Sequence, residues 1–397
     1  MKGDYGYSIL IIDIFGLRSH VNRFVRYLKL TNPLVKISLF SDMPQSCFSL
    51  ETINYLDGFI KWKRYKGMLL GLQWLGFLKR WINYGSLHYQ LTKLSRNKHF
   101  DIVNIHYPQY FMCYMMRPLR RMSSSIVVSP WGSDVLRLEG KEKRRKLARV
   151  FRKSDYTTVG KMGDIGKTLV NEMGINENKF HPLSWGSETI DYINKHLSEV
   201  SAEEAKRQLG LQNRYVITCG YNAFEEQRHE TMIEAINSIK NNLPENLTLV
   251  FPLTYGFSDN HKREYSNRLK RLCVEKDLVA VYFEEYVSVD DLFLLKMATD
   301  MFVHIQTTDG GNSSLQEYVL CGKKVVHGTW MHYPFLEQYK PLFYFPVEDL
   351  EHLGEAILCA YYSNHIEVPD QVLDYIRNRG WKAKMKLWDD FFVSLVR

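Results

Sequence analysis

The chain has 397 residues, of which 45% are hydrophobic and 24% are charged. This composition excludes disordered and fibrous proteins, and the length exceeds what one hydrophobic core usually supports, so we predict two domains of about 150 to 200 residues each. The formal net charge of +8 favours a partner with negative charge, such as nucleic acid, anionic lipid or a phosphorylated substrate.

The cysteines and the apolar runs bear on the cellular setting. The six cysteines are widely spaced without a Cys-x-x-Cys pair, which argues against a disulfide framework or a zinc site and favours a reduced, cytoplasmic setting. The run from Ser8 to Asp13 is too short for a signal peptide, and no run approaches the roughly 20 apolar residues of a membrane-spanning helix. We therefore expect any membrane contact to be peripheral.

Short β-rich runs alternate with helical patterns along the chain, which is typical of parallel sheets with crossover helices. In the first half the predicted strands are 8–13, 35–41, 101–107, 125–129 and 156–160. In the second half they are 215–220, 247–251, 279–283, 301–306 and 323–327.

Polar residues replace this alternation near 187–201, where we place the domain boundary. We predict an N-terminal Rossmann-like domain over 1–188 and a C-terminal Rossmann-like domain over 189–377. The last segment, about 378–397, has apolar residues at helical spacing and is expected to pack back on the first domain.

The stretch Asp309-Gly-Gly-Asn-Ser-Ser-Leu-Gln-Glu317 follows the predicted strand 301–306 and opens a helix that ends at Gly322. Its two glycines allow close approach of the backbone to a ligand. Free N–H groups at the helix start, with Ser313 and Ser314, suit an anion such as a diphosphate. The stretch is therefore a candidate donor site.

The two carboxylates of this stretch have two interpretations. In the first, Asp309 faces a transferred sugar and Glu317 faces another polar group of the donor, such as the ribose hydroxyls. In the second, Asp309 and Asn312 only cap the helix, and Glu317 is solvated on its outer face.

Residues 309–317 and the following Tyr-Val-Leu-Cys-Gly-Lys-Lys-Val-Val326 resemble the two-carboxylate motif of retaining GT-B glycosyltransferases. The resemblance implies an α/β fold of two Rossmann-like, doubly wound domains that face each other across a cleft. It implies that Asp309 contacts the donor sugar, that Glu317 binds ribose, and that the backbone of Gly310, Gly311 and Asn312 holds the diphosphate. An aspartate stands first here, where the family usually has glutamate.

A second resemblance covers roughly residues 214 to 350. The segments Gly220-Tyr-Asn222…Gln-Arg-His229 and Phe251-Pro-Leu-Thr-Tyr-Gly256 are similar to segments of the bacterial 4-acetamido-4,6-dideoxygalactosyltransferases of enterobacterial common antigen synthesis. This resemblance leaves the transferred sugar open.

The resemblance also implies cationic donor contacts. In the larger superfamily an arginine and a lysine neutralise the diphosphate. Arg228 stands near the lysine position, and the expected arginine falls near Tyr221 or Asn222. A charge-assisted bond from Arg228 is worth roughly 1.5 to 3 kcal/mol, and the neighbouring His229 could assist. Otherwise Arg228 is a surface side chain at a helix start.

Two further donor candidates lie at the carboxyl end of the strand 247–251, where doubly wound folds bind ligands. Thr254 could contact the donor, and Tyr255 could stack on its base. Alternatively, Tyr255 closes a hydrophobic corner.

Four residues of the first domain are candidates for the acceptor site. His106, Trp131 and Asp134 follow predicted strands in loops that resemble those of the superfamily, and we expect them to face the interdomain cleft. Gly16, after the first strand, allows a close approach or only serves a turn. His106 could instead be a satisfied structural histidine.

The segment Gly58–Phe100 contains nine basic residues and no acidic one, with tryptophan, tyrosine, phenylalanine and leucine interleaved. Such a mixture suits an amphipathic hairpin on an anionic bilayer, where each basic residue contributes about 1 kcal/mol. The alternatives are nucleic acid, for which no known motif is present, and a tryptophan-rich core with a solvated basic face.

The sequence contains no Asp-x-Asp motif, no Walker loop and no Gly-x-Gly-x-x-Gly, which favours metal-independent chemistry without a cofactor. We predict a glycosyltransferase of bacterial surface polysaccharide synthesis. Its donor is a nucleotide diphosphate sugar, its acceptor a glycan or lipid-linked glycan, and its location the inner face of the cell membrane. We assign catalysis to Asp309, His106 and Arg228. The alternatives are a GT-B nucleotide-sugar epimerase and a non-catalytic, membrane-associated scaffold.

Overall fold

The computed structural model divides the chain into two compact units, which we describe separately. Unit 1 comprises Met1–Gly186 and Trp381–Arg397, and unit 2 comprises Ser187–Gly380. The sequence placed the division between 188 and 189 and the return at about 378. The described residues are 6–14, 18–64, 76–256, 259–285, 287–308, 313–333, 338–339, 342–364 and 366–396.

Unit 1 is built on a six-stranded sheet in the order β3-β2-β1-β4-β5-β6, with all neighbouring strands parallel. This is the strand order of the dinucleotide-binding Rossmann fold. The strands are β1 (Ser8–Asp13), β2 (Lys36–Ser41), β3 (Gly58–Lys61), β4 (Phe100–His106), β5 (Ser123–Ser129) and β6 (Tyr156–Thr157).

Both faces of this sheet are buried, because side chains alternate along each strand. Ile9 and Ile11 of β1 belong to one hydrophobic core, while Leu10 and Ile12 belong to the other. The helices of unit 1 are α1 (Arg18–Thr31), α2 (Leu50–Tyr55), α3 (Gly76–Asn97), α4 (Met116–Met122), α5 (Ser133–Leu136), α6 (Lys141–Lys153), α7 (Asp164–Asn171) and α17 (Trp381–Ser394).

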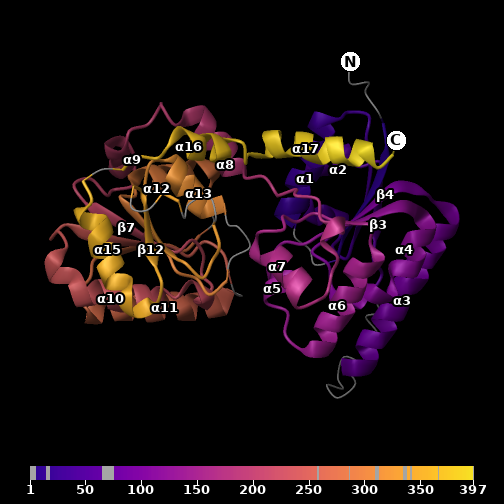
Figure 1. The fold of residues 1–397 in the computed structure, drawn as a ribbon, viewed down its shortest axis with the longest axis horizontal. Coiled ribbons are helices and arrows are strands. Elements are labelled where there is room, and N and C mark those ends of the chain that lie inside the picture. The colour runs from indigo at the N-terminus through magenta and orange to yellow at the C-terminus, as the bar shows by residue number, and fades with distance from the viewer. Residues whose placement is uncertain are drawn as a thin grey trace. The chain divides into compact units, whose positions relative to one another are not determined.

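The last helix, α17, lies beside α1 in unit 1 (Figure 1). Trp388 of α17 is fully buried, and its ring meets Phe24 of α1 edge to face at 5.2 Å. Its Nε1 donates to the carbonyl oxygen of Ser184 at 3.0 Å. A buried indole with a satisfied N–H fixes this helix on the sheet of unit 1.

Unit 2 repeats the architecture with a parallel sheet in the order β12-β11-β10-β7-β8-β9. Numbered from its own first strand, the order is again that of the Rossmann fold. The strands are β7 (Tyr215–Cys219), β8 (Leu247–Pro252), β9 (Ala280–Phe283), β10 (Met301–His304), β11 (Lys324–Gly328) and β12 (Tyr344–Val347).

Helices cover both faces of this sheet (Figure 1). One core includes residues of α8 (Glu188–His196), α9 (Ala202–Gln208), α12 (Val289–Ala298), α13 (Ser313–Leu320) and α16 (Asp370–Arg377). The other includes residues of α10 (His229–Ile239), α11 (Asp259–Glu275) and α15 (Leu353–Tyr362). Gly322 ends α13 with a φ of +69°, as a helix C-terminal glycine does.

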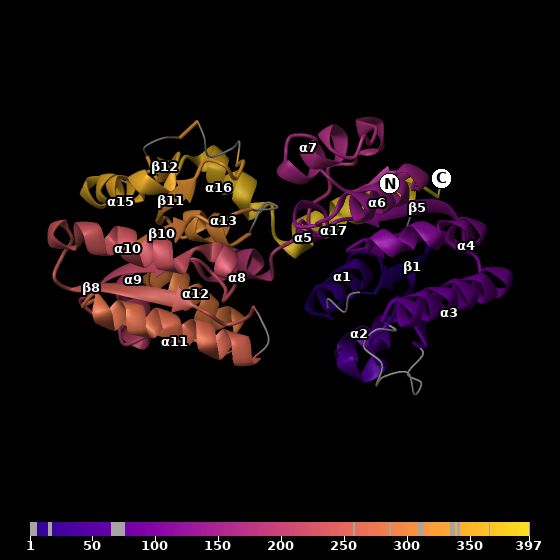
Figure 2. The same ribbon diagram turned by 90° about the horizontal axis from the view of Figure 1, so that it is seen from below.

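The predicted hairpin over Gly58–Phe100 is wrong for the described part of that segment. Gly58–Lys61 forms the edge strand β3, and residues 76–97 form the single long helix α3. This helix lies along α4 (Figure 1, Figure 2). Trp62 is only 4% exposed and belongs to a core of unit 1. The connection from β3 to β4, which contains Trp62 and α3, covers the sheet as the crossover of a Rossmann unit does. The exposed basic side chains remain on the outside.

None of the helices among the described residues is both long enough and apolar enough to cross a membrane.

Candidate functional site

Both sheets have a topological switch point, where the strand order reverses and ligands bind outside the carboxyl ends of the strands. In unit 2 this point lies between β7 and β10, which are paired in parallel. The Gly220 N–H, directly after β7, donates to the carbonyl oxygen of Val303 in β10 at 3.0 Å, and the Thr307 N–H in the loop after β10 donates to the carbonyl oxygen of Glu226 in the loop after β7 at 2.9 Å. The loops therefore form one continuous rim.

The rim depends on a glycine at its first position. Gly220 has a φ of +63°, and a Cβ there would stand 2.6 Å from His229 Nε2 and 2.8 Å from Gln227 Oε1. A side chain at residue 220 would therefore strain the backbone and displace both neighbours.

Arg228 lies in this rim as the first residue before α10. Its backbone is left-handed, with φ +61° and ψ +40°, a conformation that costs an arginine about 1 to 2 kcal/mol. Its Nη1 donates to the carbonyl oxygen of Ile305 at 3.4 Å, and its guanidinium lies 5.2 Å from the centre of the Trp330 ring. Partial burial lowers the pKa of Arg228, but a guanidinium remains charged at neutral pH.

Arg228 forms no ion pair with a carboxylate of the described residues, whereas other arginines of unit 2, such as Arg207, Arg268 and Arg377, each do. A partly buried cation that pairs with no described carboxylate, at a switch point and at a helix start, can bind an anion.

A hydrogen-bond network around Gln306 holds Trp330, the aromatic partner of Arg228. The Oε1 of Gln306 accepts from Tyr221 Oη at 3.1 Å and from Gln227 Nε2 at 2.7 Å, while its backbone oxygen accepts from Trp330 Nε1 at 2.7 Å. Gln306 is 1% exposed. Loops after three neighbouring strands are thereby joined at this edge of the sheet.

The described part of the carboxylate stretch, residues 313–317, belongs to α13, the helix that follows β10. Asp309, Gly310, Gly311 and Asn312 lie outside the described residues, as does Gly16. Ser313 and Ser314 form the first turn of α13 and are half-buried. Because α13 follows β10, its first-turn N–H groups, which have no acceptor within the helix, begin on the side of the sheet where Arg228 lies.

Glu317 is buried, so the interpretation that places it in solvent on the outer face of the helix is wrong. It is 3% exposed, its Oε1 accepts from Ser187 Oγ at 2.6 Å, and its Oε2 lies 3.2 Å from Lys296 Nζ. Lys296 on α12 is also 3% exposed. Glu317 therefore ties α13 to α12 and to the start of α8, and a ribose contact remains a prediction.

The other donor candidates occupy different positions in the rim. Asn222 is buried and accepts from the Phe224 N–H at 2.9 Å, so it shapes the loop. His229 is fully buried, its Nδ1 is 2.9 Å from Tyr265 Oη, and burial lowers its pKa to about 3. It is neutral at pH 7 and lies beneath Gly220.

Thr254 is half-buried, and Tyr255 is 54% exposed after β8. The carbonyl oxygen of Tyr255 accepts from the Ala223 N–H at 2.7 Å, which joins its loop to the rim. The described contacts leave Tyr255 the most accessible aromatic side chain among the donor candidates.

In unit 1, His106 ends β4 and is enclosed. It is 1% exposed, its Nε2 lies 3.0 Å from Asn104 Nδ2, and its ring packs against Phe24 and Trp185 with centroid distances of 4.8 and 5.0 Å. Burial, with a smaller contribution from His20, lowers the pKa of His106 to about 3. These contacts fit the structural alternative, and a role at the acceptor remains a prediction.

Trp131 and Asp134 lie in the loop after β5. Trp131 stacks on Trp185 at 4.1 Å, and Asp134 Oδ1 accepts from the N–H groups of Trp131 and Gly132 at 3.0 and 2.8 Å. Burial raises the pKa of Asp134 to about 7, although these N–H bonds act in the opposite direction. Trp131 is half-buried, so it is the more accessible of the two.

We expect His106→Gln to make folding less sensitive to acid. Because burial holds the folded pKa near 3, the unfolded chain binds more protons below pH 6.5, and stability falls with pH by about 1.4 kcal/mol per unit. Between pH 6.5 and 5, urea unfolding should show the parent losing about 2 kcal/mol more than the variant. Equal losses would contradict a buried neutral ring.

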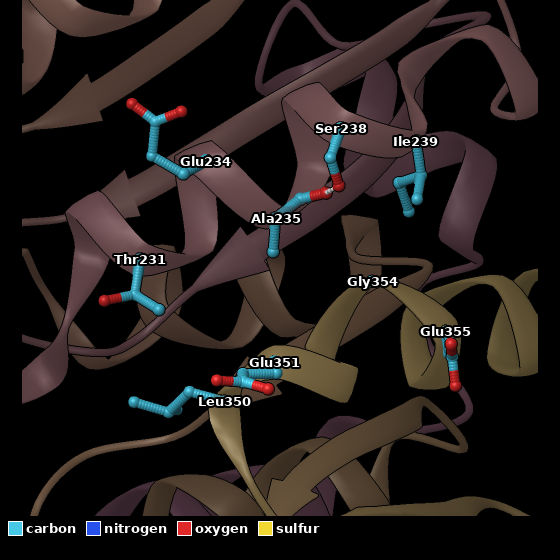
Figure 3. Close-up of a pocket in the computed structure, with 9 residues that line it drawn as sticks. All are labelled: Thr231, Glu234, Ala235, Ser238, Ile239, Leu350, Glu351, Gly354 and Glu355. Atoms are coloured by element: carbon cyan, nitrogen blue, oxygen red, sulfur yellow. Dashed lines mark hydrogen bonds between the residues drawn. The ribbon is translucent and has the colours of Figure 1, made fainter.

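A groove of about 380 Å³ lies between α10 and α15 of unit 2. Figure 3 shows Glu234, Glu351 and Glu355 among its lining side chains. Glu234 also pairs with Lys276 at 3.0 Å. A groove with three carboxylates repels a diphosphate, so the donor site is not assigned to it.

Comparison with known proteins identifies the fold. No protein-family model matches the sequence, and no curated protein matches it. Among solved structures, the chain is similar to a glycosyltransferase from Rickettsia africae, with 14% identity, a TM-score of 0.70 and 99% of each chain covered. It is also similar to HepE of Anabaena in complex with UDP and glucose, with 14% identity and a TM-score of 0.63. The match covers 98% of this chain and 97% of the HepE chain.

A third similar structure is sucrose-phosphate synthase from Thermosynechococcus elongatus, with 11% identity and a TM-score of 0.70. The match covers 98% of this chain and 99% of the synthase chain. The chain has the GT-B fold. At these identities the likeness shows the fold, which the sequence predicted correctly.

The sequence did not predict the roles of several residues at the candidate site of this GT-B chain. Gln306 and Trp330 were not assigned a role, although each follows a strand at the carboxyl edge of the sheet, which was the available signal. Lys296 gave no signal, because its burial depends on Glu317, a residue 21 positions later, and on the packing of α12. Among the described residues, no three His, Cys, Asp or Glu side chains are grouped to hold a metal ion.

Proposed function

We propose that the chain is a glycosyltransferase that uses a nucleotide diphosphate sugar. The observation that carries this proposal is Arg228, a partly buried cation without a described carboxylate partner, fixed by Ile305 and Trp330 at the switch point of unit 2. The first turn of α13, which begins at Ser313, adds backbone N–H groups at the same edge. The similarity to HepE, whose structure holds UDP and glucose, supports a nucleotide-sugar donor.

In the proposed reaction the bond between the sugar and the diphosphate breaks, and a bond to an acceptor hydroxyl forms. The leaving nucleoside diphosphate takes the bonding electrons, and the acceptor proton passes to it or to water. Negative charge therefore grows on the diphosphate, where Arg228 and the N-terminus of α13 stabilise it more strongly in the transition state. Asp309 would orient the sugar, with retention of the anomeric configuration and without a metal or cofactor.

A thermal-shift screen tests the donor class. We expect one of UDP, GDP or TDP at a hundred times its dissociation constant to stabilise the protein by about 2.7 kcal/mol. The shift and the transfer reaction should persist in excess chelator, since the charge is neutralised by Arg228 and N–H groups. Loss of both in chelator, with recovery in magnesium or manganese, would contradict the metal-independent reaction.

We further propose transfer of a hexose or deoxyhexose to a glycan or lipid-linked acceptor at the cytoplasmic face of the membrane, in bacterial surface polysaccharide synthesis. Support comes from the basic segment, where Lys61, Lys63 and Lys79 are exposed and Trp81 is 48% exposed. A basic surface with an exposed indole suits contact with an anionic bilayer.

Replacing Lys61, Lys63 and Lys79 with serine should weaken sedimentation with anionic vesicles. Each residue contributes about 1 kcal/mol near such a surface, and added salt should screen the attraction. The matched control replaces the exposed Arg214, Arg263 and Arg271 of unit 2. Equal sedimentation of both variants, or of the parent with neutral and anionic vesicles, would refute the surface.

A further inference from the structure

Unit 1 contains a pocket of about 240 Å³ at the carboxyl edge of its sheet. Its walls come from the residues after β1, β3 and β4 and from the first turns of α3. This volume is below the roughly 300 to 1,000 Å³ of pockets that enclose whole drug-sized ligands, so it suits one compact group of a ligand.

Two arginines, Arg64 and Arg80, line this pocket, and their surroundings contain little negative charge. Residues 58–100 contain no aspartate or glutamate. Among the described carboxylates only Asp42 pairs with either arginine, through Arg64. Burial raises the pKa of Asp42, and this effect exceeds the opposite effect of Arg64. With two arginines and one neighbouring carboxylate, the pocket is positively charged.

The Arg64 guanidinium is held on two sides. Its centre lies 4.5 Å from the centre of the Trp62 ring, and its Nη2 bonds to the Asp42 carboxylate. A guanidinium carries five N–H donors in a fixed fork, so these contacts orient Arg64 and leave donors for a ligand. Arg80, on α3, is exposed and forms no ion pair with a described residue.

The remaining walls strengthen a charge interaction. Trp62 is 4% exposed, and its Nε1 is buried without an acceptor in the described part of the chain. Tyr84 stacks on Phe111 with a centroid distance of 4.6 Å. Aromatic walls lower the local dielectric and so strengthen ionic hydrogen bonds. The amide side chain of Gln109 can add a neutral N–H donor.

We propose that this pocket of unit 1 binds a phosphate-bearing group. The guanidinium groups of Arg64 and Arg80, the amide of Gln109 and the compact volume match the tetrahedral oxygens of phosphate. The group can belong to a free phosphate compound or to a lipid headgroup. The inference goes beyond the proposed function, because its residues belong to unit 1 and do not include Arg228.

Calorimetry on the full chain tests the site. Arg228→Asn serves as the background, so that binding at the donor site of unit 2 is weakened. The probes are inorganic diphosphate and dihexanoyl phosphatidic acid below its micelle concentration, with dihexanoyl phosphatidylcholine as the lipid control. Adding Arg80→Gln or Arg64→Gln should weaken binding about ten- to a hundredfold. Adding Arg96→Gln, on the last turn of α3, should change it less than twofold.

Tighter binding of phosphatidic acid than of diphosphate, with the same dependence on Arg80, would identify a lipid headgroup as the source. The opposite ranking would identify a free phosphate compound. Binding of neither probe, or equal effects of Arg80→Gln and Arg96→Gln, would overturn the inference. Titrating UDP, GDP and TDP into the parent and into Arg80→Gln distinguishes this inference from the donor proposal. Failure of every nucleotide to bind the parent would count against the donor proposal alone.

Discussion

Glu317→Gln should lower the free energy of unfolding of unit 2 by about 3 to 5 kcal/mol, because it leaves Lys296 as a buried cation without its counter-ion. Both side chains are at most 5% exposed and lie 3.2 Å apart. Urea denaturation followed by circular dichroism measures the loss. The control Glu199→Gln removes a carboxylate that is 58% exposed and should change stability by less than about 1 kcal/mol.

The double variant Glu317→Gln with Lys296→Met separates stability from binding. Removing both charges should restore most of the lost stability, since a buried ion pair can often be replaced by apolar residues without a net cost. If Glu317 also binds ribose, the refolded double variant should still bind the nucleoside diphosphate about ten- to a hundredfold more weakly. Restored stability together with unchanged affinity would limit Glu317 to a structural role.

Asp309→Asn should reduce turnover of the donor by about a hundred- to a thousandfold, the usual effect of removing one group that stabilises a transition state. The variant keeps the size of the side chain and removes its charge, so affinity for the bare nucleoside diphosphate should change by less than about threefold. Steady-state release of nucleoside diphosphate from the donor measures the first effect, and calorimetry measures the second.

Asp374→Asn provides the matched control, because that carboxylate is 69% exposed in unit 2. It should leave both turnover and affinity unchanged. If Asp309→Asn also leaves turnover within about twofold, then Asp309 does not contact the reacting sugar, and the carboxylate stretch has only a structural role.

The sequence predicted the buried strands well and missed two edge strands. Strands such as β1 and β7 are covered on both faces and therefore read as continuous apolar runs. The strand β3 is half-buried and ends in a lysine at the start of the basic segment, so its four residues do not form an apolar run that would predict a strand. The strand β12 contains Pro346, which is tolerated at a sheet edge and argues against a strand in the sequence.

The candidate site was predictable where it depends on strand ends and not where it depends on packing. The sequence placed Arg228 after the first strand of unit 2, and the structure places it at the switch point. Its left-handed backbone and its position over Trp330 depend on loops that are distant in sequence. The burial of Glu317 likewise depends on Lys296 and Ser187, which no local pattern indicates.

Calorimetric titration of the nucleoside diphosphate found in the thermal-shift screen tests the central claim, that Arg228 holds the donor diphosphate. The variant is Arg228→Asn, because asparagine tolerates the left-handed backbone and should keep the fold within about 1 kcal/mol of the parent. The control is Arg207→Gln, at an arginine that is 71% exposed. We predict a ten- to hundredfold loss of affinity in Arg228→Asn and less than a twofold change in the control. Equal affinity in the parent and in a folded Arg228→Asn would contradict the donor site.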